Sequence, residues 1–217
     1  HPATDAPAPS SNTVRRSTRA VAERPGRLGS VQGTIDLLGQ GSGNAVDAGQ
    51  IVDSFSLARD GVEFFCHSPF IKHCNGTDVL RNEAALIFNV RLRADGSDYD
   101  FLQIGDSTWD VLEDVVQTTR YHGNGDRLRW DLHNLPHHCS YLALSDDKGK
   151  SETTPKPLVK DLLLEGKSGA YIVSSSDPIP DSADMYERVQ PPHIQARKAY
   201  KSHLDQIGGR RLLVTME

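Results

Sequence analysis

Apolar and polar side chains alternate most regularly in two segments, residues 86–93 and 127–132. The apolar positions are Leu86, Phe88, Val90, Leu92, Leu128, Trp130 and Leu132. A two-residue period of this kind predicts strands with one apolar face. Gly-Asn-Gly-Asp at residues 123–126 is strong turn chemistry and separates the second strand from what precedes it.

Several further segments have a weaker strand pattern, and Gly-rich or Asp-rich turns separate many of them. They are residues 34–38, 51–57, 62–66, 100–104, 109–116, 140–144, 158–164 and 170–174. Many short strands at such spacing favour a sandwich or barrel over a parallel sheet. The expected fold is therefore mainly β, an antiparallel β-sandwich or jelly-roll-like domain over residues 31–217, although residues 102–116 also admit a short helix.

One helix is predicted near the end of the chain, at about residues 193–207. Ile194, Tyr200 and Leu204 fall on one of its sides, and Gly208-Gly209 ends it. Basic residues are dense on its other side and just beyond its end: Arg197, Lys198, Lys201, Arg210 and Arg211. Most basic helix faces of this kind are simply solvated.

Residues 1–30 contain almost no large apolar side chain and are expected to form a disordered arm or a pro-segment. Five arginines lie in this arm, at positions 15, 16, 19, 24 and 27. If the protein were a coat protein, they would bind nucleic acid with a steep salt dependence.

Composition excludes two classes of function. The formal net charge of -5 argues against a molecule that binds polyanions by overall charge, so any such contact would be local. No apolar run is long enough to span a bilayer. The chain starts at His1, and we expect that any signal peptide has been removed.

Two features favour a secreted or extracytoplasmic protein. Asn75-Gly76-Thr77 is an acceptor for N-glycosylation, and Cys66 and Cys74 are close enough in sequence to bridge a hairpin loop. We therefore expect a Cys66–Cys74 disulfide. The alternative is a metal centre, because Cys66, His73, Cys74, His137 and Cys139 carry the ligand types that zinc prefers.

Three aspartates lie in one predicted turn region, at Asp95, Asp98 and Asp100. Clustered carboxylates suit calcium, and the simpler interpretation is a hairpin turn. Trp109 and Tyr121 could add a sugar-stacking surface. These five residues are the predicted binding residues, and calcium or zinc is the expected type of cofactor if one is bound.

Candidate catalytic residues are His133 and His137 with Asp131, because imidazole can act as a general base or a metal ligand. The chain contains neither a Gly-x-Ser-x-Gly elbow nor a His-Glu-x-x-His motif. A metal-dependent hydrolase or lyase is thus one interpretation of the His/Cys-rich segments.

The expected function is a secreted β-sandwich recognition module that binds a glycan or a protein surface through residues 95–108 and 121–139. A viral coat or assembly protein is a second interpretation, with a jelly-roll domain, an arginine-bearing arm and self-association. The His/Cys metal-dependent hydrolase or lyase is a third.

Overall fold

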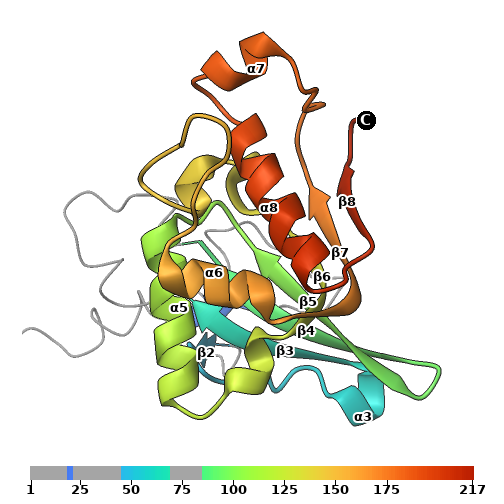
Figure 1. Cartoon of the computed structure of the whole chain (residues 1–217). Helices are drawn as coiled ribbons and strands as arrows, with labels where there is room; N and C mark the ends of the chain where they lie inside the picture. Colours follow the sequence, from blue (N-terminus) through green and yellow to red (C-terminus); the bar gives the residue numbers. More distant parts are fainter. Residues whose placement is uncertain (1–18, 22–44, 69–84) are drawn as a thin grey trace, which may run out of the picture.

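The computed structural model describes residues 19–21, 45–68 and 85–217, and these ranges contain a six-stranded mixed sheet (Figure 1). Its strands are β3 (Val62–Ser68), β4 (Ile87–Ala94), β5 (Ser97–Ile104), β6 (Trp130–Asn134), β7 (Gly166–Ser174) and β8 (Arg211–Val214). They lie side by side in the order of the chain, β3 to β8. The pairs β3–β4 and β4–β5 are antiparallel, whereas β5 to β8 run parallel to one another.

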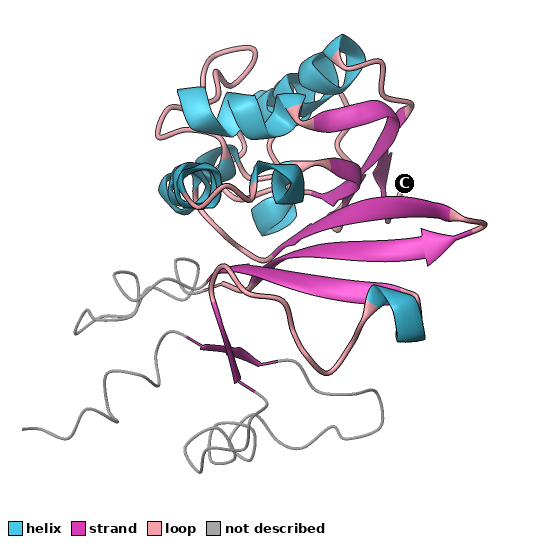
Figure 2. Ribbon diagram, turned by 90° about the horizontal axis from the view of Figure 1, so that it is seen from below, coloured by secondary structure: helices cyan, strands magenta, loops and turns pink. Residues whose placement is uncertain are grey.

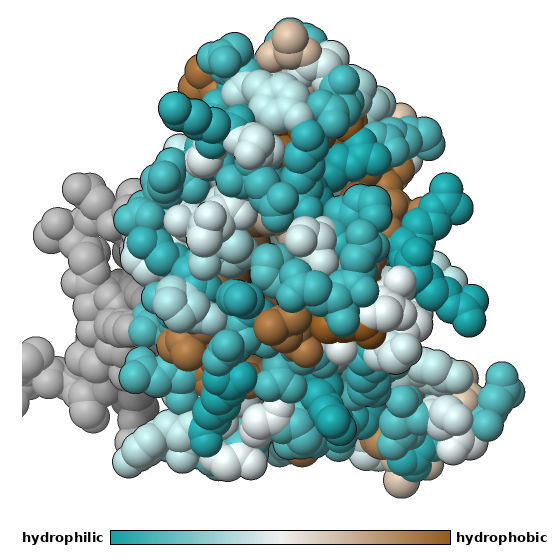
Figure 3. Space-filling view, in the orientation of Figure 1, coloured by the Kyte–Doolittle hydropathy of each residue, from teal (hydrophilic) through white to brown (hydrophobic). Residues whose placement is uncertain are grey.

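Helices connect the parallel strands and lie together on one side of the sheet (Figure 2). They are α5 (Trp109–Tyr121), α6 (Pro157–Leu164), α7 (Ala183–Glu187) and α8 (Ile194–Gln206). Short 3-10 turns η1 (Gly125–Leu128), η2 (Pro136–His138) and η3 (Tyr141–Ala143) flank β6, and α3 (Leu57–Asp60) precedes β3. Hydrophilic side chains cover most of the helix-side surface (Figure 3). Within the described residues, no helix has the length and apolar character needed to cross a membrane.

The mainly β prediction is wrong, because the structure is a mixed α/β sheet rather than a sandwich or jelly roll. Segments 109–116 and 158–164, expected to be strands, lie in α5 and α6. In α5 the buried residues are Val111, Leu112, Val115, Val116 and Thr119, which is the helical period of a face packed on a sheet. The β-branched valines favour strands by propensity, and packing against the sheet overrides that preference.

The main core lies between the sheet and these helices. Trp130 is fully buried there, and its indole N–H donates to the carbonyl of Leu162 in α6 at 3.1 Å. Gly166 begins β7 beside this ring, where an added Cβ would lie 2.4 Å from Trp130 Cζ2. Glycine at this position therefore lets α6 and β7 approach the tryptophan closely.

A smaller apolar cluster covers part of the other face of the sheet. Val46 of β2 (Ala45–Asp47), Val52 and Cys66 form it, with three phenylalanines packed around them: Phe55, Phe64 and Phe88. β2 pairs with β1 (Arg19–Val21), so part of the segment expected to be a disordered arm forms a strand. The remainder of that arm, the predicted strand 34–38, and residues His73, Cys74 and Asn75 lie outside the described residues.

A network of charged side chains joins β4, β5, β6 and β7 near the start of the parallel strands. Asp100 is buried and accepts from Arg91 Nε at 2.8 Å, while Lys167 Nζ lies 3.0 Å from its other oxygen. Lys167 also donates to Asp131 at 2.7 Å, and Asp131 accepts the Asp100 backbone N–H. These cations lower the pKa of Asp100 although its desolvation raises it. We call these four residues the Asp100 network.

Candidate anion-binding site

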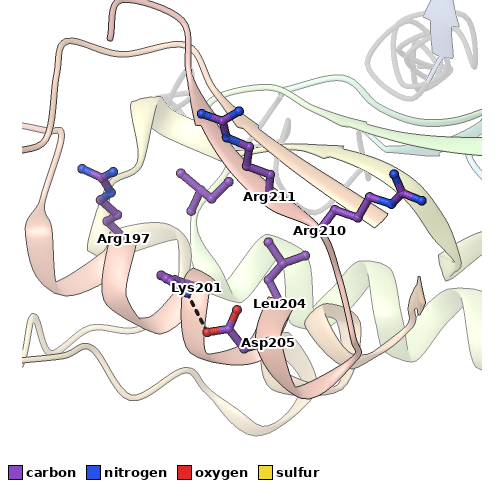
Figure 4. Close-up of a pocket in the computed structure, with 7 residues that line it drawn as sticks. Arg197, Lys201, Leu204, Asp205, Arg210 and Arg211 are labelled. Atoms are coloured by element: carbon purple, nitrogen blue, oxygen red, sulfur yellow. Dashed lines mark hydrogen bonds and ion pairs between the residues drawn. The ribbon is translucent and has the colours of Figure 1, made fainter. Parts of the chain in front are cut away.

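A groove lined by basic side chains lies between α8 and β8, with a cavity volume of about 160 Å³ (Figure 4). We call it the α8–β8 groove, and its lining residues are Arg197, Lys201, Leu204, Asp205, Arg210, Arg211 and Leu212. Four of the seven are cations, and Asp205 is the one carboxylate among these described lining residues. The groove is thus a local concentration of positive charge on a protein whose formal net charge is -5.

The sequence positions these cations through the packing of α8. Buried residues of this helix include Ile194, Ala199, Tyr200 and Leu204. Arg197, Lys201 and Asp205 follow one another at intervals of four residues, so they form one stripe along the helix. This stripe is left at the surface because the buried residues hold the opposite side of α8 against the sheet.

A tight return after α8 places the other two cations beside the first two. Gly208 has a φ of 67°, in the left-handed region that favours glycine. An added Cβ on Gly209 would lie 2.1 Å from Leu204 Cδ1, so only glycine allows this close approach. Arg210 and Arg211 follow directly and form the second wall of the groove.

The four cations differ in whether a carboxylate already neutralises them. Arg197 contacts Glu217 at 2.9 Å, and Lys201 pairs with Asp205 at 2.7 Å on the exposed surface of α8. Within the described residues, the side chains of Arg210 and Arg211 make no ion pair. Half of the positive charge in the groove is therefore available to a ligand.

Lys198, which belongs to the basic patch seen in the sequence, is directed elsewhere. Its ammonium lies 3.1 Å from Asp181 and 4.9 Å from the centre of the Tyr186 ring, and it donates to the Tyr186 hydroxyl. Position 198 is about 100° around the helix axis from position 197. The structure thus separates Lys198 from the other four basic residues.

The predicted catalytic residues are not brought together. His133 is buried, its Nδ1 lies 3.4 Å from the Leu102 carbonyl, and burial lowers its pKa to about 4. Asp131 faces Lys167 near the start of β6, whereas His137 lies beyond the end of that strand. A buried neutral imidazole inside the core is a structural residue rather than a general base.

A strained turn follows β6, with a left-handed backbone at His137, His138 and Cys139. Each such residue costs about 1–3 kcal/mol, and strain of this kind clusters at functional sites. His138 lies between Asp106, 3.8 Å from its Nε2, and Ser175, whose hydroxyl is 3.5 Å from its Nδ1. The turn therefore places a carboxylate, an imidazole and a hydroxyl near one another at the ends of β5, β6 and β7.

The hydrogen bonding of His138 argues against a serine nucleophile in this arrangement. Its Nδ1 lies 2.7 Å from the carbonyl oxygen of Ser175, and a carbonyl can only accept, so this nitrogen carries the proton. It cannot then take a proton from the Ser175 hydroxyl. The neighbouring Cys139 is no better a nucleophile, because burial raises the pKa of its thiol to about 12.

The predicted metal ligands are dispersed over the described residues. Cys66 is buried in β3, and its thiol donates to the Ser68 carbonyl at 3.3 Å, whereas Cys139 lies in the main core beside α8. In residues 19–21, 45–68 and 85–217, no three His, Cys, Asp or Glu side chains come together as a metal site. Because Cys74 and His73 lie outside these ranges, the Cys66–Cys74 disulfide stays a prediction.

The predicted binding residues are also far from forming one surface. Asp95 lies in the two-residue turn between β4 and β5, where it and Gly96 both have a positive φ, as expected for a hairpin. Asp98 pairs with Arg93 at 2.7 Å, and Asp100 belongs to the Asp100 network. The hairpin interpretation thus accounts for the aspartates without calcium.

Trp109 and Tyr121 occupy opposite ends of α5, about 18 Å apart along its axis. Trp109 packs against the core with Lys156 Nζ 4.7 Å from its ring centre, whereas Tyr121 is 84% exposed. These two rings do not form a common stacking surface. β5 (Ser97–Ile104) takes up more than half of the predicted binding segment 95–108, and β6 (Trp130–Asn134) takes up a smaller part of segment 121–139.

A second cavity, of about 120 Å³, lies beside α5 and β3 and includes His67 in its lining. Both nitrogens of His67 are occupied, by the Thr119 hydroxyl and the Arg127 carbonyl, each at 3.0 Å. Burial lowers the pKa of this histidine to about 4. His67 is therefore a neutral residue whose two ring nitrogens are already hydrogen-bonded, so neither is available to a ligand.

No protein-family model matches the chain, and neither a curated protein nor a solved structure matches it. The candidate site is therefore defined by its own residues and their geometry. The basic residues of the α8–β8 groove were visible in the sequence as a cluster. The sequence did not show that Leu204 and Leu212 form an apolar part of the groove lining, because this depends on how α8 packs beside β8.

Proposed function

We propose that this protein is a recognition module that binds an anionic ligand in the α8–β8 groove. The observation that carries the proposal is the pair Arg210 and Arg211, two residues that line the groove and have no ion-pair partner among the described residues; their guanidinium groups point apart in Figure 4. Arginine presents a planar fork of N–H donors that matches carboxylate, sulfate and phosphate groups. A cavity of about 160 Å³ has room for one such group.

The proposal keeps the class of protein predicted from the sequence, a recognition module, and assigns its binding site to a different place. Of the predicted binding residues, Asp100 is buried and Asp98 is already paired with Arg93, whereas the groove combines exposure with uncompensated charge. A catalytic role is less well supported, because His133 and Cys139 are buried and His138 donates to a carbonyl.

The first test titrates tripolyphosphate, a compact polyanion, into the full chain by isothermal calorimetry. Arg210→Ala combined with Arg211→Ala should weaken binding about tenfold, since each exposed charge pair contributes up to about 1 kcal/mol. The matched control combines Lys150→Ala with Lys160→Ala, which removes the same charge from exposed positions outside the groove. Equal loss in both double variants would assign the binding to overall charge and reject the groove.

Secretion remains part of the proposal as a property predicted from the sequence. It is supported by the Asn75-Gly76-Thr77 acceptor and the spacing of Cys66 and Cys74. Intact mass with and without reductant, on protein from its natural source, tests it. A glycan on Asn75 and a gain of two hydrogens on reduction would support export.

A further inference from the structure

One cation of the α8–β8 groove already holds a carboxylate of this chain. Arg197 Nη1 lies 2.9 Å from Glu217 Oε1, and Arg197 Nη2 lies 3.4 Å from Glu217 Oε2. The backbone N–H of Ile179 donates to the same Oε1 at 3.1 Å. This two-point contact of guanidinium and carboxylate is the geometry that arginine offers to acidic side chains.

The lining of the groove favours a peptide over a base or a sugar. None of its seven described lining residues is aromatic, so it lacks the ring surface on which nucleobases and sugars stack. Leu204 and Leu212 instead supply an aliphatic surface next to the cations. An acidic side chain has a matching composition, a short aliphatic stem that ends in a carboxylate.

The spacing of the cations points in the same direction. Arg197 and Lys201 are one helical turn apart, about 6 Å along the axis of α8. In an extended peptide, side chains at alternate positions are on one side and about 6.6 Å apart. Acidic residues at every second position of an extended segment therefore match the axial spacing of Arg197 and Lys201, provided that they displace the Glu217 and Asp205 carboxylates that these two cations now hold.

We infer that the α8–β8 groove binds an extended acidic peptide segment of another protein, with Arg210 and Arg211 holding carboxylates as Arg197 holds Glu217. This inference rests on the proposed anion-binding function and adds the class of partner to it. Glu217 is then an internal competitor, because it occupies a guanidinium that a ligand could use.

The test uses the full chain and a ten-residue peptide in which glutamate and serine alternate, with dissociation constants measured by calorimetry. The peptide should bind, and its glutamine counterpart should bind at least about tenfold more weakly. Arg210→Ala with Arg211→Ala should weaken binding of the glutamate peptide about tenfold, and Lys150→Ala with Lys160→Ala should leave it nearly unchanged.

A further variant, Glu217→Gln, removes the carboxylate charge from the Arg197 guanidinium, which still donates to the Ile179 carbonyl, and it keeps the size of the side chain. It should strengthen binding of the glutamate peptide about threefold, the effect of one exposed ion pair. Weaker binding in this variant would contradict the role of Glu217 as a competitor.

The outcomes separate this inference from the proposed function. Tripolyphosphate binding that depends on Arg210 and Arg211, without binding of the glutamate peptide, overturns the peptide inference and leaves the anion site. Tighter binding of a sulfated oligosaccharide than of the peptide, with the same arginine dependence, overturns it in favour of a glycan. Failure of all three probes overturns both proposals.

Discussion

Two clusters of charged residues lie on the same sheet, and they differ in how their charges are balanced. In the Asp100 network, Asp100 and Asp131 face Arg91 and Lys167, and the central carboxylate is almost fully buried. In the α8–β8 groove three of the four cations are exposed and Arg197 is partly buried, and Arg210 and Arg211 have no carboxylate partner in the described part of the chain. Mutual compensation makes the first cluster part of the fold, whereas the uncompensated charge of the second is free for a ligand.

The largest effect is expected from Asp100→Ala. Removing Asp100 takes the buried carboxylate away from both Arg91 and Lys167, which keep only the more exposed Asp126 and Asp131, and this costs about 3 kcal/mol of unfolding free energy. Urea unfolding at neutral pH measures this loss. Asp98→Ala is the matched control, since it breaks an exposed pair with Arg93 and should change stability little. Similar losses in both variants would show that burial of the Asp100 network does not matter.

The same network should respond to acid. The pKa of Asp100 is lowered in the folded protein below its ordinary value of 3.8. The ionised carboxylate therefore stabilises the fold fully at a pH above 3.8, and this stability is lost as the pH falls through the folded pKa. The difference in unfolding free energy between the wild type and Asp100→Asn should therefore be full at pH 6 and shrink below pH 3.8. A difference that persists unchanged at pH 2 would contradict the ionised state of Asp100.

The smallest effect on stability is expected in the groove. Arg210→Ala with Arg211→Ala should change the free energy of unfolding by less than about 0.5 kcal/mol, because these side chains make no ion pair within the described residues. Substitutions in the Asp100 network should thus reduce stability, whereas substitutions in the α8–β8 groove should reduce binding. A large loss of stability in the arginine double variant would show that Arg210 and Arg211 stabilise the fold.

The sequence predicted those parts of the fold whose pattern is local. The period of Leu86 to Leu92 identified β4, and the apolar side of residues 193–207 with Gly208-Gly209 identified α8 almost to its ends. Asp95 with Gly96 was recognised as turn chemistry. In each case the residues that decide the structure are neighbours along the chain.

The prediction failed where contacts with a segment distant in the sequence decide the secondary structure. Val111, Val115 and Val116 suit a strand by propensity, and their helical spacing becomes decisive only when α5 packs on the sheet. The parallel pairing of β6 with β5 and β7 connects residues more than thirty positions apart, and the sequence contains no local signal for it. The basic patch was recognised, but its separation from Lys198 required the orientation of α8.

The strand order has a consequence for how the protein is made. Because β3 to β8 follow one another both in space and along the chain, each strand can join the sheet as soon as it is synthesised. A ribosome adds about 5–20 residues per second, so β3 to β7 have time to form before α8 and β8 emerge. The α8–β8 groove is then the last part of the molecule to be completed, and a nascent chain that stalls within α8 would be largely folded yet lack the groove.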